Sequence, residues 1–171
     1  MNSRISFRIL LAPALIASVA ACSGTDADPP EEAVVEGEAT EAGDVSAVEA
    51  RQENYEAIGD AFKAIRGQLE GDSPDFALIQ TSAEEIGAKM EANRTLFPEG
   101  TGVGSGADTE ALDVIWEDMG GFTDALDNNI AAATALAEAG GAADLAAVQE
   151  GVKNLGATCK ACHDKYRLDD D

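Results

Sequence analysis

The chain has 171 residues and a formal net charge of −22, with 33 acidic and 11 basic side chains. This length predicts one modest domain with short appendages. Such a negative surface excludes nucleic acid and anionic lipid headgroups as electrostatic partners. It favours either plain solubility or the steering of a basic partner protein. Aromatic residues make up only 5% of the chain, and almost no stretch alternates with period two, so we predict an all-helical fold.

The N-terminus has the features of an export signal, because Arg4 and Arg8 precede an apolar stretch too short for a transmembrane helix. We assign residues 1–21 to this signal. It is followed by Cys22, and the four letters VAAC resemble the lipobox of bacterial lipoproteins, which predicts lipidation of this cysteine. The alternative is an ordinary signal peptide that leaves Cys22 as an odd free thiol.

An acidic segment with two adjacent prolines and no aromatic residue spans residues 22–43 and predicts a disordered tether. The folded domain is then expected over residues 44–171. Ser23 stands where some bacteria place an Asp that retains lipoproteins at the inner membrane. We therefore favour the outer membrane, facing the periplasm, with a soluble periplasmic protein as the alternative.

Two amphipathic helices are predicted in the first half of the domain. A capping box at 46–49 opens the first helix, and Gly71 ends it. Ser73 and Pro74 then act as N-cap and first residue of the second helix. Steps of three and four residues define an inward face on each helix. The inward residues are Val48, Arg51, Tyr55, Ile58, Phe62, Ile65 and Leu69, then Ile79, Ala83, Ile86, Met90 and Asn93.

Two further helices are predicted after a glycine-rich crossing loop at 97–106. The third helix opens near Asp108 and is ended by Gly140 and Gly141. Four amphipathic helices with short joins predict an all-α, antiparallel four-helix bundle. The inward residues are Leu112, Ile115, Met119, Phe122, Leu126, Ile130 and Ala133, then Leu145, Val148, Val152, Leu155, Cys159, Cys162 and Tyr166.

The last helix carries the motif C-x-x-C-H, the signature of covalent attachment of c-type haem. Cys159 and Cys162 lie about one turn apart, as thioethers to two vinyl groups of one porphyrin require. His163 would then supply an axial nitrogen to the iron. A thioredoxin-like site would be expected near a βαβ pattern. Structural zinc needs four ligands, and three cysteines and one histidine fall short of this number once Cys22 is lipidated. We predict one haem c in the bundle, and a chance match is the alternative.

Four segments give the chain a family resemblance: RQ at 51–52, FPEGTG at 97–102, IW at 115–116 and TCKACHDKYR at 158–167. They resemble the class II cytochromes c, in particular cytochrome c′, over residues 45–168. The haem motif near the C-terminus is also typical of class II, since class I carries it near the N-terminus. Because cytochromes c′ are often homodimers through their first two helices, the resemblance alone implies a homodimer.

The resemblance implies roles for residues around the haem. Arg51 and Gln52 match residues that contact the propionates, although Arg51 could instead only extend its charge to solvent. Arg167 matches a cation beside the proximal imidazole, although it could instead offset the helix dipole. Low-spin relatives have Met as sixth ligand four residues after the Arg, where this chain has Tyr55. A neutral phenol is a poor ligand, so we predict five-coordinate iron with Tyr55 and Phe97 crowding its open face. Alternatively, Tyr55 is a packing residue with its hydroxyl at the bundle edge.

The predicted function is binding of nitric oxide, and more weakly carbon monoxide, together with electron exchange. A mostly hydrocarbon pocket lacks the polar donor that dioxygen needs, whereas nitric oxide binds without one. The alternative is plain electron transfer to a basic redox partner through a low-spin, six-coordinate haem, with Met90 or Met119 as ligand. We recognise no nucleophile, base and oxyanion arrangement and expect no enzyme. We expect contact with a membrane through the lipid anchor only.

Overall fold

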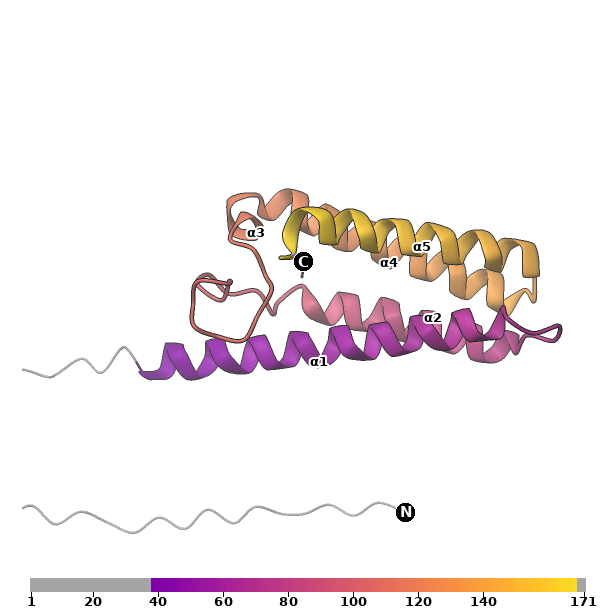
Figure 1. Ribbon diagram of the computed structural model, residues 1–171, viewed down its shortest axis with the longest axis horizontal. Helices are drawn as coiled ribbons and strands as arrows, with labels where there is room; N and C mark the ends of the chain where they lie inside the picture. The colour runs from indigo at the N-terminus through magenta and orange to yellow at the C-terminus, as the bar shows by residue number, and fades with distance from the viewer. Residues whose placement is uncertain (1–37, 169–171) are drawn as a thin grey trace, which may run out of the picture. The chain divides into compact units, whose positions relative to one another are not determined.

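The computed structural model describes the backbone of residues 38–168 and the side chains of residues 45–168. Its helices in this part of the chain are α1 (Glu38–Gln68), α2 (Phe76–Asn93), α3 (Val114–Glu117), α4 (Met119–Gly141) and α5 (Leu145–Tyr166) (Figure 1). The predicted export signal, Cys22 and most of the predicted tether lie outside the described residues. Between residues 38 and 168, no helix has both the length and the apolarity needed to cross a membrane.

The four long helices form a bundle, which confirms the predicted all-α fold. α1 packs on α2, α2 on α4 and α4 on α5. In Figure 1, the α1–α2 hairpin forms one layer and the α4–α5 hairpin the other. Among the described helices, α1 and α5 are not closely packed on each other, although they occupy neighbouring corners of the bundle. One side of the bundle is therefore left without direct helix–helix packing.

The first helix begins earlier than we predicted. It starts at Glu38, so residues 38–43 are helical rather than part of the tether, and the expected capping box at 46–49 lies inside the helix. The physical reason is the run of Glu and Ala, which are good helix formers, upstream of the box. Backbone N–H groups at 46–49 can then bond within the helix and need no cap.

The start of α2 also differs from our prediction. The N-cap is Asp75 rather than Ser73, and the helix begins at Phe76. The Asp75 carboxylate accepts hydrogen bonds from the backbone N–H groups of Ala77 and Leu78 at 3.0 and 3.1 Å. A carboxylate at this position satisfies two of the free N–H groups and interacts favourably with the helix dipole.

The predicted third helix is divided in two. Residues near Asp108 remain in the loop, and the chain breaks at Asp118, whose backbone leaves the helical region with φ −131° and ψ 51°. The Asp118 carboxylate then caps α4 by accepting from the Gly121 N–H at 3.2 Å. Met119, the first residue of α4, directly follows this break and is 40% exposed instead of buried, whereas Ile115 before it and Phe122 after it are buried as predicted. Leu145, the first residue of α5, is 43% exposed, which also contradicts its predicted inward position.

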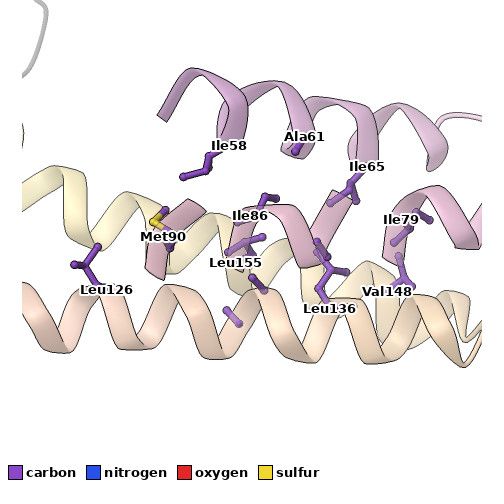
Figure 2. Packing of buried hydrophobic residues seen from close by; sticks show 14 of the residues in the cluster. Ile58, Ala61, Ile65, Ile79, Ile86, Met90, Leu126, Leu136, Val148 and Leu155 are labelled. Carbon is purple, nitrogen blue, oxygen red and sulfur yellow. The ribbon is translucent and has the colours of Figure 1, made fainter. Parts of the chain in front are cut away.

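The core of the bundle is formed largely by the predicted inward residues. Every predicted inward residue of α2 is buried, and the buried residues of the other helices pack against them (Figure 2). Burying one such aliphatic side chain contributes about 1.5–3 kcal/mol to folding. The ten labelled in Figure 2 are Ile58, Ala61, Ile65, Ile79, Ile86, Met90, Leu126, Leu136, Val148 and Leu155.

A long crossing loop joins α2 to α3 and is bonded to α1 mainly through the side chain of Arg51. Arg51 is only 2% exposed, and its Nη1 donates to the Leu96 carbonyl at 3.1 Å and to Thr101 Oγ at 2.8 Å. Its Nη2 donates to the Thr101 carbonyl at 2.5 Å and to Thr109 Oγ at 2.8 Å. Four of the five guanidinium N–H groups are thus used by the loop. We call this set of bonds the Arg51 clamp.

The loop is also bonded to the C-terminal end of α5. The Leu112 N–H donates to the Tyr166 carbonyl at 3.0 Å, and the Leu168 N–H donates to the Glu110 carbonyl at 2.8 Å. An isolated antiparallel bridge pairs Ala111 with Arg167. The loop therefore connects the two helices, α1 and α5, that do not pack on each other directly.

The Arg51 clamp yields a prediction about stability. In Arg51→Lys the ammonium keeps the charge but cannot reproduce four bonds in fork geometry, so we expect a loss of about 3 kcal/mol, because bonds from charged donors are each worth about 1.5–3 kcal/mol. Urea unfolding of the haem-loaded protein measures this. Arg66→Lys, an exposed exchange on the same helix, should change stability by less than about 0.5 kcal/mol. Equal losses in the two variants would contradict the clamp.

A second prediction concerns the contact of α2 with α4. A Cβ added at Gly140 would lie 2.9 Å from the Gln80 backbone nitrogen and 3.1 Å from its Cα. Because backbone cannot move aside cheaply, Gly140→Ala should destabilise the bundle by about 1–3 kcal/mol in thermal unfolding. Gly67→Ala, whose new Cβ meets nothing within 4 Å, should instead stabilise by up to about 1 kcal/mol. A stabilising Gly140→Ala would refute this account of the contact.

Candidate haem site

A cavity of about 690 Å³ fills the side of the bundle where α1 and α5 are not packed together. Its apolar walls come from all five described helices and the crossing loop. All the site residues predicted within the described part line it: Arg51, Gln52, Tyr55, Phe97, Cys159, Cys162, His163 and Arg167. The residues that the sequence analysis selected therefore all lie around one cavity.

One wall of the cavity is the face of α5 that carries the C-x-x-C-H motif. The thiols of Cys159 and Cys162 are half-buried and form no disulfide with each other, while His163 is exposed beside them. Burial raises the pKa of the Cys159 thiol, and burial together with the neighbouring Cys159 raises that of Cys162 to about 11. Both thiols are therefore protonated at neutral pH in the haem-free chain.

Asn129 of α4 holds this wall from behind. It is 1% exposed, and its Oδ1 accepts from the Cys159 thiol at 3.3 Å and from Thr158 Oγ at 3.0 Å. Its Nδ2 donates to the Ala125 carbonyl at 2.9 Å. All polar atoms of this buried amide are thus satisfied, and the amide orients the first cysteine of the motif.

The opposite wall belongs to α1 and presents Tyr55. Burial raises the pKa of its phenol well above the usual value, Cys162 adds to this, and the neighbouring amide of Asn93 opposes it. The phenol is therefore neutral under all ordinary conditions. This places an uncharged hydroxyl-bearing ring across the cavity from the motif.

A row of aromatic rings crosses one end of the cavity. Phe97 meets Phe122 edge-on at 4.7 Å between ring centroids, and Phe122 meets Tyr166 edge-on at 5.3 Å. The Arg51 guanidinium lies 4.6 Å from the centroid of Phe97. Such pairs add about 0.5–1.5 kcal/mol each beyond area burial. Phe97 is thus held between a cation and a ring, and the Trp116 Nε1–H donates to its carbonyl at 3.0 Å.

The polar residues at the cavity mouth differ in how they are held. No described carboxylate forms an ion pair with Arg51, and burial lowers the pKa of its guanidinium. Gln52 donates through Nε2 to the Asp108 carbonyl. Arg167 forms an ion pair with Glu110 and is the extended C-cap residue of α5 rather than a helical residue.

The two methionines considered as iron ligands are placed differently. Met90 is 4% exposed and lines the cavity, whereas Met119 is exposed and does not line it. Met119 directly follows the break at Asp118 and is the first residue of α4. Of the pair, Met90 alone faces the cavity.

Three polar residues around the cavity had no role in our sequence prediction. Thr101 receives the Arg51 clamp, Asn129 contacts Cys159, and Asn93 contacts Tyr55. Asn93 and Asn129 share a recognisable signal, since each is a polar residue in phase with the inward stripe of its helix. A buried amide needs partners, so its presence on a stripe marks a polar contact inside the bundle.

The cavity fits a haem in volume and chemistry. Its volume lies within the 300–1,000 Å³ that is typical of cofactor pockets. Both thiols lie on one wall, one helical turn apart, with the histidine next to them. A buried guanidinium without an ion pair can accept an anion, such as a propionate, near its Nε–H.

Comparison with known proteins agrees with this site. The family described as Cytochrome C′ matches residues 46–167. Cytochrome c′ of Pararhodospirillum photometricum is 39% identical over 121 residues, which cover 70% of this chain and 94% of that protein. The crystal structure of cytochrome c′ from Thermochromatium tepidum has a TM-score of 0.67 and 28% identity, covering 74% of this chain and 97% of that one.

A further solved structure bears on the ligand. It is a nitric oxide complex of a variant cytochrome c′ from Alcaligenes xylosoxidans, with a TM-score of 0.66 and 26% identity over 74% of this chain and 97% of that one. The family match and the first relative each cover more than two thirds of this chain. The chain belongs to the cytochrome c′ family, whose cofactor is a haem c attached covalently through cysteine.

Proposed function

We propose that the protein holds a five-coordinate haem c that binds nitric oxide, and more weakly carbon monoxide, and exchanges electrons. Cys159 and Cys162 would carry the thioethers, and His163 the axial nitrogen. The haem iron, when bound, would supply one open coordination position for a diatomic gas. The observation that carries the proposal is Tyr55, a neutral phenol on the wall opposite the motif.

The lining of the cavity supports a site that admits small uncharged ligands. Apart from Tyr55, the haem motif and the polar residues at the mouth, the lining consists largely of hydrocarbon side chains and one thioether. These residues exclude water and leave little room for a large ligand. They are Ile58, Phe62, Ile86, Met90, Ile115, Phe122 and Leu155.

Polar side chains at the mouth of the cavity are placed where they could bind the carboxylates of the cofactor. Arg51 has one N–H, at Nε, outside its clamp, and Gln52 lies beside it on α1. A charge-assisted bond to a carboxylate would offset the cost of burying the guanidinium. Arg167 would act from the other side of the mouth while Glu110 restrains it.

The coordination of the iron gives the decisive test. The ferric protein at neutral pH should show a high-spin absorption and EPR spectrum, and the ferrous protein should bind nitric oxide. Tyr55→Met should become largely low-spin, because a thioether at this position can reach the iron where a neutral phenol does not ligate. A low-spin ferric spectrum of the unaltered protein would refute five-coordination and favour plain electron transfer.

The control for this test is Met90→Leu. Met90 lines the cavity from α2 and is the competing thioether. If the unaltered protein is low-spin and Met90→Leu restores a high-spin spectrum, Met90 is the sixth ligand. If both proteins are high-spin, the open position stands.

We also propose that the protein is exported and attached to a membrane, with the outer membrane favoured, by lipidation of Cys22. The support is the sequence pattern before this residue, since it lies outside the described part of the structure. The domain would then work in the periplasm, where a basic redox partner could approach its acidic surface. A homodimer through α1 and α2 stays a prediction from the resemblance.

The anchor has a direct test. Cys22→Ala removes the only thiol that can be lipidated at the end of the signal, so the variant should move from the membrane fraction to the soluble fraction. Haem content, measured by absorption, should be the same in the two fractions and serves as the control. A Cys22→Ala protein that stays with the membranes would contradict the anchor.

A further inference from the structure

A chain of polar side chains passes from the surface of the bundle to the wall that carries Tyr55. The Lys89 Nζ of α2 donates to Asn54 Oδ1 of α1 at 3.1 Å. Asn54 Nδ2 in turn donates to Asn93 Oδ1, back on α2, at 2.8 Å. Lys89 and Asn54 are partly buried, and Asn93 is fully buried. These bonds end at Asn93, which lies next to Tyr55, the residue that follows Asn54 on α1.

Lys89 fixes the direction of every bond in this chain. An ammonium group has donors only, so Asn54 must present its oxygen to Lys89 and its NH₂ to Asn93. Asn93 must then present its own oxygen to Asn54. The oxygen and nitrogen of a side-chain amide can usually be assigned in either of two ways, but here the lysine is compatible with only one of them. As a result, the NH₂ group of Asn93 is turned away from Asn54.

This NH₂ group has an unusual status. The Nδ2 of Asn93 is buried and forms no hydrogen bond of normal geometry, and it is alone in this among the buried side-chain atoms of the described residues. Leaving such a donor unpaired is costly. The phenol of Tyr55 is its polar neighbour, because Asn93 acts on it as a hydrogen-bond donor and lowers its pKa against the larger effect of burial. A small adjustment of either side chain would complete the bond.

Resting on the proposed function, we propose that Lys89, Asn54 and Asn93 hold the Tyr55 hydroxyl as a hydrogen-bond donor directed into the haem cavity. When Asn93 donates to the phenol oxygen, the hydroxyl hydrogen must point away from Asn93. The free direction is the cavity that Tyr55 lines. Lys89, Asn54 and Asn93 are therefore positioning residues for gas binding, although none of them lines the cavity.

The consequence is a polar group over the expected open face of the haem. A donor at this place favours ligands whose outer atom becomes more negative on binding. The pocket would then contain the polar donor that our sequence analysis expected a mostly hydrocarbon pocket to lack. Its selectivity would depend on a surface lysine that two amides separate from the tyrosine.

The probe for the test is carbon monoxide bound to the ferrous holoprotein, with its stretching frequency measured by infrared absorption. A hydrogen bond to the outer oxygen lowers this frequency. Tyr55→Phe removes the hydroxyl and should raise the frequency, which defines the value without a donor. Lys89→Glu should also raise the frequency, although residue 89 does not line the cavity. A carboxylate only accepts hydrogen bonds, so Asn54 and then Asn93 would each have to exchange the positions of their oxygen and NH₂ group. Tyr55 would then donate its hydrogen to the Asn93 oxygen instead of directing it into the cavity.

Two matched variants control for charge and for the chemistry of the donor. Lys89→Arg keeps a side chain that only donates, so its frequency should equal that of the unaltered protein. Lys153→Glu makes the same charge change on α5, at a side chain that is 76% exposed and whose closest charged group is Glu150 at 3.8 Å. It should also leave the frequency unchanged. An unchanged frequency in either Tyr55→Phe or Lys89→Glu would overturn the proposal.

A second measurement does not depend on gas binding. If carbon monoxide does not bind, the proposed function fails. The contact between Asn93 and Tyr55 is then tested on its own by a double-mutant cycle of Asn93→Leu and Tyr55→Phe in the ferric holoprotein. A completed bond predicts that the two shifts in unfolding midpoint are not additive. Additive shifts would overturn the inference even in a protein that binds the gas.

Discussion

A buried guanidinium connects the fold of this protein with its site. Arg51 lies inside the bundle without an ion pair among the described residues, so hydrogen bonds must compensate the charge. The crossing loop provides them through Leu96, Thr101 and Thr109. Those bonds place the loop across the end of the cavity and hold Phe97 under the cation. The residue that orders the loop therefore also forms part of the cofactor site.

The cavity takes the place of a helix–helix interface. α1 and α5 are neighbours that do not pack closely, and the cavity lies between them. In an ordinary bundle this side would be filled by large side chains, whereas this chain has aromatic residues at only 5% of its positions. A bound porphyrin would provide the missing apolar surface and join the two hairpins. Binding of the cofactor would therefore also complete the hydrophobic core.

Sequence periodicity predicted much of this structure, and its failures have physical causes. The α2 stripe from Ile79 to Asn93 is buried throughout, because no break disturbs its phase. At Asp118 a single non-helical residue interrupts the predicted third helix, which periodicity cannot foresee, and Met119 directly after it is exposed. The haem motif identified α5, and the resemblance added the residues facing it. The contacts of Asn93 and Asn129 could not be predicted, since they depend on which side chains meet across helices.

The state of the two thiols bears on the order of events in the making of this protein. A thiolate is the reactive form of cysteine, and the closed bundle keeps Cys159 and Cys162 protonated in an apolar cavity, with the first of them bonded to Asn129. A chain that closed before receiving its porphyrin would therefore offer less of the reactive thiolate than an open chain does. The interior that protects the finished cofactor is, for the same reason, a poor place in which to attach it.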